Sequence, residues 1–178
     1  MTRNKTRPLP PVERLREYLQ LDYETGRLFW VKAKNVKHPA GKEAALSKNG
    51  KRGYMVLGWD GTTYLKHRII YLMANGVDPG LNVVDHINGD KSDNCPSNLR
   101  IATSQQNSMN MNGPNRNNKT GVLGVHWNSQ NKAWCAKLRA NGRNICRFFK
   151  SFDDAVVEIK RLRAEHYGDF RGSVIRCA

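Results

Sequence analysis

Two side chains of complementary chemistry stand next to each other after a short apolar run. Asp85 and His86 follow Val83 and Val84 directly. The aspartate carboxylate is a hard oxygen ligand suited to Mg²⁺, and histidine has an ordinary pKa near neutrality, so it can act as a general base. The pair is therefore equipped to activate a water molecule beside a divalent metal ion.

A polar loop comes next, and its composition favours turns. Residues 88–98, NGDKSDNCPSN, are mainly Asn, Asp, Ser, Gly and Pro, which suit turn geometry. The following stretch, LRIATSQQNSMN, has apolar spacing compatible with a helix that carries Asn107 on its polar side. Taken one at a time these features also fit an ordinary surface loop. Their order, a strand ended by Asp-His, then a loop and a helix, is much more specific.

The segments before the pair predict the elements that must hold it in place. Apolar residues at helical spacing predict a short helix over 11–21. Thr-Gly at 25–26 and Asp-Gly at 60–61 separate β-rich runs, which indicates an antiparallel sheet. Residues 67–76, HRIIYLMANG, are typical of a second helix closed by its final Asn-Gly.

The charge of the chain indicates a polyanionic partner. Lys and Arg number 30 against 15 Asp and Glu, which gives a formal net charge of +15 and a pI near 10.0. Residues 1–112 have 17 basic and 10 acidic side chains, and residues 113–178 have 13 and 5. Nucleic acid is the commonest polyanion that such a balance serves.

The sequence offers no support for a membrane or secreted protein. No apolar run approaches the roughly 18 residues of a spanning helix, and the basic start MTRNKTRPLPP is followed by no hydrophobic core of a signal peptide. We therefore expect a protein of a reducing cytoplasm with no membrane partner. The four cysteines stand far apart without a C-x-x-C pair, so we expect free thiols and no structural zinc site: Cys95, Cys135, Cys146 and Cys177.

A linker and a second sheet are predicted in the last third of the chain. Residues 113–120, GPNRNNKT, contain no hydrophobic residue, which is typical of a linker. Three strands are expected beyond it, joined by a loop at 128–132 and an Asn-Gly turn at 141–142. Asp153 is placed to cap a final helix that ends at Gly168.

The middle strand of this sheet has two different faces. Side chains alternate along a strand, so Trp134, Ala136 and Leu138 share one face, and the other carries Cys135, Lys137 and Arg139. We expect the helix to cover the apolar face and the basic face to be left for a ligand.

The motifs around Asp85 resemble those of the HNH endonucleases and their ββα-metal (His-Me finger) fold. The segment DHINGDKSDNCPSNLRIATSQQN, and before it YETGRLFW and GYMVLGWDGTTYLKHRII, are similar to segments of phage and intron-encoded HNH homing endonucleases. The resemblance covers roughly residues 18–112. If the gene is carried by a phage, the expected compartment is the cytoplasm of the bacterial host.

Carried over to this sequence, the resemblance implies a role for each motif residue. Asp85 and Asn107 would bind one divalent metal ion per active site, and His86 would deprotonate the attacking water. Asn98 would hydrogen-bond the loop backbone and so orient His86, with Asn94 as the second candidate for this role. The last letter of the motif is Asn and not His, and a neutral amide ligand favours Mg²⁺ or Mn²⁺ over zinc.

His67, in LKHRII, also recurs in such sequences. We expect it to contact a phosphate or to support the residues around the metal.

A second resemblance covers residues 119–170. GVLGVHW, KAWCAKLRANGR and FKSFDDAVVEIKRLRAEHYGDF are similar to the ethylene-response-factor (Apetala-two) type of DNA-binding domain, in which a three-stranded sheet enters the major groove and a helix packs behind it. This implies DNA contacts for Arg139, Arg143, Arg147, Lys137 and Trp127, although Trp127 fits a core position equally well. The helix lacks the alanine-rich, tyrosine-containing face of that family, so the DNA target is not transferred.

The sequence thus predicts an α+β chain, with a ββα-metal (His-Me finger) nuclease domain and a small domain of a three-stranded antiparallel sheet packed on one helix. The expected parts are a basic N-terminal segment and short helix at 1–20, the HNH domain at 21–112, the linker at 113–120, the sheet-and-helix domain at 121–172 and a tail at 173–178.

The function that these resemblances imply is metal-dependent hydrolysis of double-stranded DNA by His-activated water, which leaves a 5′ phosphate and a 3′ hydroxyl. A DNA-binding regulator that has kept a nuclease scaffold without catalysis is the alternative. A ribosomal or RNA-binding protein would account for the charge but not for the Asp-His pair. The oligomeric state is left open.

Overall fold

Backbone contacts divide the chain in front of Ser104. The computed structural model describes residues 7–33, 38–44, 47–49, 53–111 and 113–175. The two units are Met1–Thr103 and Ser104–Ala178. The division falls ahead of the predicted linker at 113–120, and it places Asn107 in the second unit.

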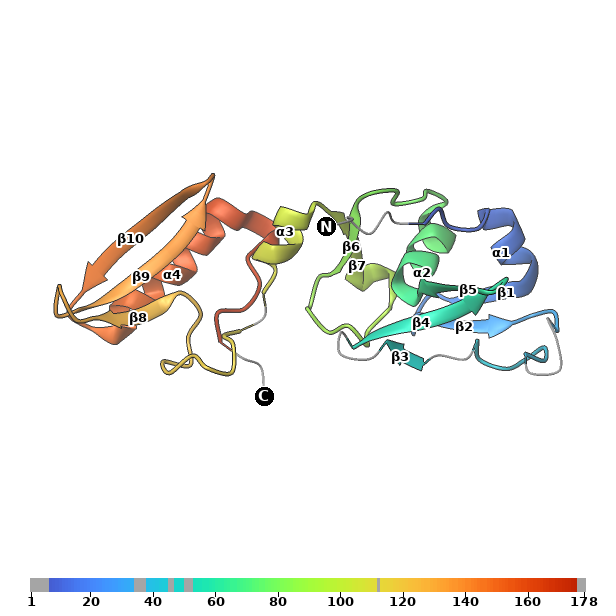
Figure 1. Cartoon of the computed structure of the whole chain (residues 1–178), viewed down its shortest axis with the longest axis horizontal. Helices are drawn as coiled ribbons and strands as arrows, with labels where there is room; N and C mark the ends of the chain where they lie inside the picture. Colours follow the sequence, from blue (N-terminus) through green and yellow to red (C-terminus); the bar gives the residue numbers. More distant parts are fainter. Residues whose placement is uncertain (1–6, 34–37, 45–46, 50–52, 112, 176–178) are drawn as a thin grey trace. The chain divides into compact units, whose positions relative to one another are not determined.

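The first unit mixes helices with short antiparallel strands (Figure 1). Its elements are α1 Val12–Tyr18, β1 Leu19–Asp22, β2 Arg27–Trp30, β3 Ser47–Asn49, β4 Tyr54–Trp59, β5 Thr62–Leu65, α2 Lys66–Asn75, β6 Val83–His86, the 3₁₀ helix η2 Pro96–Asn98 and β7 Leu99–Ala102. Strand β1 pairs with β2, strands β3, β4 and β5 form one sheet in that order, and β6 pairs with β7. The hairpin predicted at Asp60-Gly61 is confirmed as the β4–β5 turn.

One hydrophobic core holds these elements together. Leu15 of α1 and Ile69 and Ile70 of α2 are fully buried. The rings of Trp30 and Trp59 stack with their centroids 6.0 Å apart. Each such side chain contributes about 1.5–3 kcal/mol when it leaves water, so the core fixes α2 against the strands.

Two sequence predictions in this unit were wrong in extent. The first helix ends at Tyr18 and not near Leu21, because Leu19 and Leu21 alternate with exposed Gln20 along β1. The stretch after the polar loop begins as a strand, β7, and turns helical only from Ser104. A strand forms there because its backbone pairs with β6, and this pairing outweighs the local helical spacing.

The second unit is built around a three-stranded antiparallel sheet with the order β10-β9-β8. Its elements are α3 Ser104–Met109, β8 Val125–Asn128, β9 Ala133–Ala140, β10 Arg143–Phe149, α4 Phe152–Tyr167 and the 3₁₀ helix η3 Gly168–Phe170. Figure 1 shows α4 running along one face of this sheet.

Helix α4 covers the apolar face of β9, as the alternation predicted. Ala136 and Leu138 are buried against Ala155 and Ile159 of the helix. The predicted cap, Asp153, lies in the first turn of α4, and the capping residue is Ser151. Its hydroxyl oxygen accepts the backbone N–H groups of Asp153 and Asp154, because only a residue ahead of the helix has the extended backbone that a cap needs.

Cys95, Cys135 and Cys146 are free thiols, as predicted, and Cys177 lies outside the described residues. Across the described part of the chain, none of the helices combines the length and the apolar character needed to cross a lipid bilayer.

The β1–β2 turn packs directly against the polar loop. Gly26 has a φ of +63°, and a Cβ atom at this position would overlap the Asn94 carbonyl and the peptide bond to Cys95. The Cys95 thiol reaches back to the carbonyl oxygens of Tyr23 and Glu24, with Sγ 3.4 and 3.2 Å from them. The β1–β2 turn therefore supports the loop after β6 by direct packing.

We expect Gly26→Ala to destabilise the first unit strongly, because it adds a clash with the loop backbone to the cost of a positive φ. Gly61→Ala is the matched control, since Gly61 also ends a hairpin turn with a φ of +71° but has nothing within 4 Å of its would-be Cβ. The control should cost about 1 kcal/mol of unfolding free energy, and Gly26→Ala at least about 2 kcal/mol more. Denaturant unfolding of the full chain measures both, and equal losses would contradict the packing role of Gly26.

Candidate active site

Asp85 and His86 are the last two residues of β6 and both are buried, each with 4% of its surface exposed. Antiparallel pairing places Asp85 opposite Arg100 and His86 opposite Leu99 of β7. Burial of an aspartate and a histidine side by side is costly unless each is matched by a partner. The surrounding residues supply those partners.

Arg100 neutralises the buried carboxylate. Its Nε and Nη2 atoms each lie 3.0 Å from Oδ2 of Asp85. These two contacts hold the carboxylate in one orientation. Arg100 was missed in the sequence analysis. Its position opposite Asp85 depends on the register of β6 with β7, and that register depends on how the loop between them folds.

Asn94 contacts His86 directly. Its Oδ1 lies 3.3 Å from Nε2 of His86, and its Nδ2 donates to the carbonyl oxygen of Ser92. Since the amide nitrogen is the donor to Ser92, the amide oxygen is the acceptor, and Nε2 of His86 carries the proton. In the neutral imidazole the basic nitrogen is then Nδ1.

Asn98 organises the backbone of the loop. Its Oδ1 accepts the backbone N–H of Asn88 at 3.0 Å, and its Nδ2 donates to Oδ1 of Asn88 and to the carbonyl oxygen of Asp93. Asn98 thus bridges the two ends of the loop, while the direct contact to His86 comes from Asn94, the residue that sequence reasoning ranked second.

His67, the histidine that the sequence analysis singled out in LKHRII, lies beside His86. It projects from α2, is 3% exposed, and its ring meets that of His86 edge-on with the centroids 5.0 Å apart. The ring of Tyr54 on β4 packs against both, at 5.1 and 6.1 Å. Helix α2 and strand β4 of the first unit therefore meet at His86.

Burial controls the charge of both histidines. It lowers the pKa of His67 to about 3, and the nearby charges of His86 and Arg68 add to this shift. Burial also lowers the pKa of His86, although the hydrogen bond to Asn94 and the charge of Asp85 oppose the change. Both imidazoles are therefore neutral near pH 7, and a neutral imidazole is the form that accepts a proton.

The chemistry of Asp85 fits a hard divalent cation. Mg²⁺ is commonly held by one or two carboxylates together with waters and substrate phosphates. Within the described residues no group of three His, Cys, Asp or Glu side chains is placed to hold a metal ion. Asn107, the other predicted ligand, is half-buried on α3 in the second unit.

The strand register of the second unit separates the predicted DNA-contacting residues into two groups. Arg139 pairs with Asn144, whereas Arg143 and Arg147 pair with Ala140 and Ala136. Paired residues of an antiparallel sheet point to the same side. Arg143 and Arg147 therefore lie on the side of the sheet that α4 covers, and Arg139 points to the opposite side.

Lys137 and Trp127 divide in the same way. Lys137 shares the face of Arg139, away from α4, by the alternation along β9. Trp127 pairs with Trp134, which packs on Phe152 of α4. Trp127 is 50% exposed and its ring meets that of Trp134 edge-on at 5.4 Å, so it lies at the margin of the α4-facing core.

The segment that carries the buried Asp85–His86 pair is similar to one nuclease family. A family model described as HNH endonuclease matches residues 64–109. Protein 3.8 of Escherichia phage T7 is 33% identical over 107 residues, which are 59% of this chain and 86% of that protein. The segment at residues 64–109 therefore belongs to the HNH endonuclease family.

Two further relatives share parts of the chain. An uncharacterized HNH endonuclease of Acanthamoeba polyphaga mimivirus is 37% identical over 125 residues, which span 68% of this chain and 62% of that protein. Among solved structures, one of DNA binding and cleavage by the HNH homing endonuclease I-HmuI is 29% identical, with a TM-score of 0.39. That match covers 51% of this chain and 49% of the other.

The depressed pKa of His67 makes a prediction about acid stability. Native His67 stays neutral down to about pH 3, while the unfolded chain takes up a proton near pH 6.5. As the pH falls through this window the unfolded state binds the extra proton, so His67 lowers the free energy of unfolding by up to about 1.4 kcal/mol per pH unit. Between pH 6.5 and 4 the free energy of unfolding of His67→Phe should therefore fall less steeply than that of the parent, by about 1.4 kcal/mol per pH unit. Denaturant unfolding at each pH measures this difference. If the free energies of unfolding of variant and parent fall with pH at the same rate, His67 is not buried in its neutral form.

Proposed function

We propose that the protein is a metal-dependent endonuclease that hydrolyses a phosphodiester bond of duplex DNA. The observation that carries the proposal is the buried Asp85–His86 pair, in which Arg100 holds the carboxylate and Asn94 holds the imidazole. The match of residues 64–109 to the HNH endonuclease family agrees with this chemistry. The net charge of +15 agrees with a polyanionic substrate.

In the proposed mechanism His86 acts as the general base. Nδ1 of His86 takes a proton from water, and the resulting hydroxide attacks the phosphorus atom in line with the departing 3′ oxygen. The bond from phosphorus to the 3′ oxygen breaks and that oxygen takes a proton from a second water molecule, so the products carry a 5′ phosphate and a 3′ hydroxyl. The hydrogen bond from Nε2 to Asn94 stabilises the imidazolium that forms.

Asp85 would hold one Mg²⁺ or Mn²⁺ ion, as a carboxylate does together with waters and substrate phosphates. Such an ion, when bound, stabilises negative charge on the phosphate and on the leaving oxygen. Arg100 keeps the carboxylate oriented and compensates its charge in the buried site.

The second unit is proposed to bind duplex DNA. Its exposed basic side chains on the face of β9 away from α4, Lys137 and Arg139, are the first candidates because they stand free of the core. Arg143, Arg147 and Trp127 remain candidates from the other side of the sheet. The resemblance to the ethylene-response-factor type of domain supports this assignment through the same segments.

The first test of this function is metal dependence. The full chain should nick supercoiled plasmid in Mg²⁺ or Mn²⁺ and leave it intact in EDTA, because Asp85 needs a cation to act on phosphate. Agarose gels that follow relaxed and linear forms measure it. Cleavage at the same rate in EDTA would remove the metal mechanism. Tight DNA binding without cleavage in either metal would favour the non-catalytic regulator.

His86→Ala should lower the rate of the chemical step by about 10² to 10⁴, the usual contribution of a general base, with DNA affinity nearly unchanged. Single-turnover cleavage at saturating DNA separates the two effects. The assignment of the base is wrong if this variant cuts at the parental rate.

Substitutions of Asn94 and Asn98 should change different measured quantities, the pH–rate profile for Asn94 and the free energy of unfolding for Asn98. Asn94→Ala removes the bond that raises the pKa of His86, so the acid limb of the pH–rate profile should move to lower pH, with a rate loss of about two- to tenfold at neutral pH. Asn98→Ala should instead lower the free energy of unfolding by about 1–3 kcal/mol, because it removes the hydrogen bonds that tie Asn88 and Asp93 together. Identical pH–rate profiles for the parent and Asn94→Ala would contradict a direct role of Asn94 at His86.

A further inference from the structure

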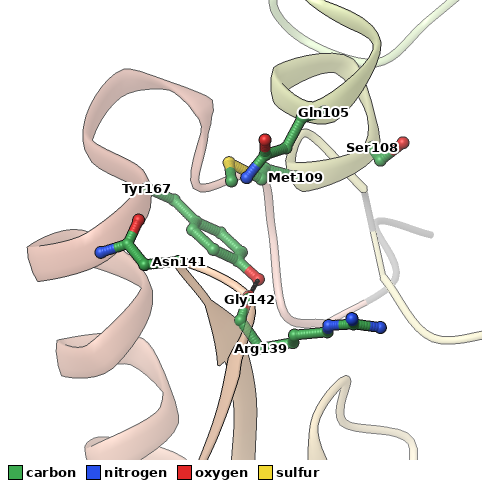
Figure 2. Close-up of a pocket in the computed structure, with 7 residues that line it drawn as sticks. All are labelled: Gln105, Ser108, Met109, Arg139, Asn141, Gly142 and Tyr167. Carbon is green, nitrogen blue, oxygen red and sulfur yellow. Dashed lines mark hydrogen bonds between the residues drawn. The ribbon is translucent and has the colours of Figure 1, made fainter.

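A pocket in the second unit lies between α3 and the β9–β10 turn. Figure 2 shows α3 above it and the side chain of Arg139 extending below that helix. The pocket has a volume of about 440 Å³ and is lined by Gln105, Ser108, Met109, Arg139, Asn141, Gly142 and Tyr167. All of these residues belong to the second unit.

The lining has one cation and no acid. The guanidinium of Arg139 forms no hydrogen bond or ion pair within the described part of the chain, and the same is true of the side-chain amide of Gln105. The hydroxyl of Ser108 is already committed to the carbonyl oxygen of Ser104. Two unpartnered donor groups, one of them positively charged, thus face a space that holds an anion better than any other ligand.

Both walls of the pocket are held by hydrogen bonds. The hydroxyl of Tyr167 donates to the carbonyl oxygen of Arg139 at 2.8 Å, which fixes the strand end below. Arg163 of α4, 5% exposed, donates through Nη2 to the carbonyl oxygen of Met109 at 2.8 Å and also to the carbonyl oxygen of Arg171. These hydrogen bonds hold α3 and the end of β9 in place on either side of the pocket.

The apolar part of the lining selects among anions. The ring of Tyr167 and the side chain of Met109 form one wall. The volume exceeds that of a phosphate ion, and a deoxyribose packs well on such a surface. A sugar–phosphate unit of a nucleic-acid strand matches both the charged and the apolar parts.

Helix α3 presents two different faces. At about 100° per residue, Gln105, Ser108 and Met109 fall within about 100° of one another, and Asn107 lies about 150° from their centre. The face toward the pocket is thus separate from the face that carries the predicted metal ligand.

We infer that this pocket is the seat of one backbone phosphate of the bound DNA, with Arg139 as its cation and the Gln105 amide as a second donor. The inference rests on the proposed function. It assigns Arg139 to sequence-independent phosphate binding and not to reading a base. It also makes α3 a shared element, with the DNA backbone on one face and Asn107 on the other.

The test measures the affinity of the full chain for two fluorescein-labelled 30-bp duplexes of unrelated sequence across a series of salt concentrations, in EDTA. Arg139→Gln should weaken binding about tenfold at low salt, and equally on both duplexes. It should also reduce the slope of log Kd against log salt by about 0.9, the value for one lost phosphate contact. Gln105→Ala should weaken binding about two- to fivefold with the slope unchanged.

Arg161→Gln is the matched control. It removes the same charge from the same unit, but Arg161 is paired with Glu158 and Glu165 on the exposed side of α4. Its affinity and salt slope should equal those of the parent. The double variant Gln105→Ala with Arg139→Gln should lose less affinity than the two single losses combined, because both side chains serve one phosphate.

The outcomes separate the two proposals. A parental salt slope for Arg139→Gln, or a loss on one duplex and not the other, would overturn the phosphate seat and leave the nuclease proposal standing. If the parent chain binds neither duplex, the proposed function fails as well, and the seat fails with it.

Discussion

A buried carboxylate needs a compensating charge, and in the first unit Arg100 supplies it to Asp85. The ion pair joins two strands, and the strand pairing that creates it also carries His86 into the interior. An isolated charge at that depth would be expelled or protonated. The β6–β7 register is therefore the condition for the site, because a shift of one residue would turn Arg100 to the opposite side of the pair.

Support for the imidazole comes from residues that are distant in sequence. His86 is held by Asn94, Asn94 lies in a loop braced by Asn98, and this loop rests on the turn at Gly26. On its other side His86 meets His67 from α2. A side chain held in this way has little conformational freedom left to lose, so the fold itself fixes the orientation of the His86 imidazole.

Features with local causes could be predicted from the sequence. The Asp60-Gly61 turn and the end of α2 at Asn75 depend on residues within a few positions of one another, and the Asp-His pair followed from adjacency alone. The position of Arg100 opposite Asp85 could not be predicted, because it depends on how the loop between β6 and β7 folds and so sets the strand register. Asn94 was ranked behind Asn98 for the same reason.

The side of the sheet taken by Arg143 and Arg147 was available in principle. A two-residue turn at 141–142 pairs Ala140 with Arg143, and the alternation then assigns Arg147 to the same side. The prediction treated the three arginines as one group because each is exposed and basic. Composition indicates a polyanionic partner, while the strand register decides which side chains can act together.

The anchoring of α3 by Arg163 has a consequence for how such proteins diversify. A chain of two compact units can diversify when one unit is exchanged for another. In this chain an exchange point within 113–120 would separate the carbonyl oxygen of Met109 from the guanidinium that holds it, and the transplanted module would arrive without its own helix. Crossovers ahead of Ser104 keep that bond intact, but they move Asn107 and the end of the segment that matches the HNH endonuclease family into the exchanged part.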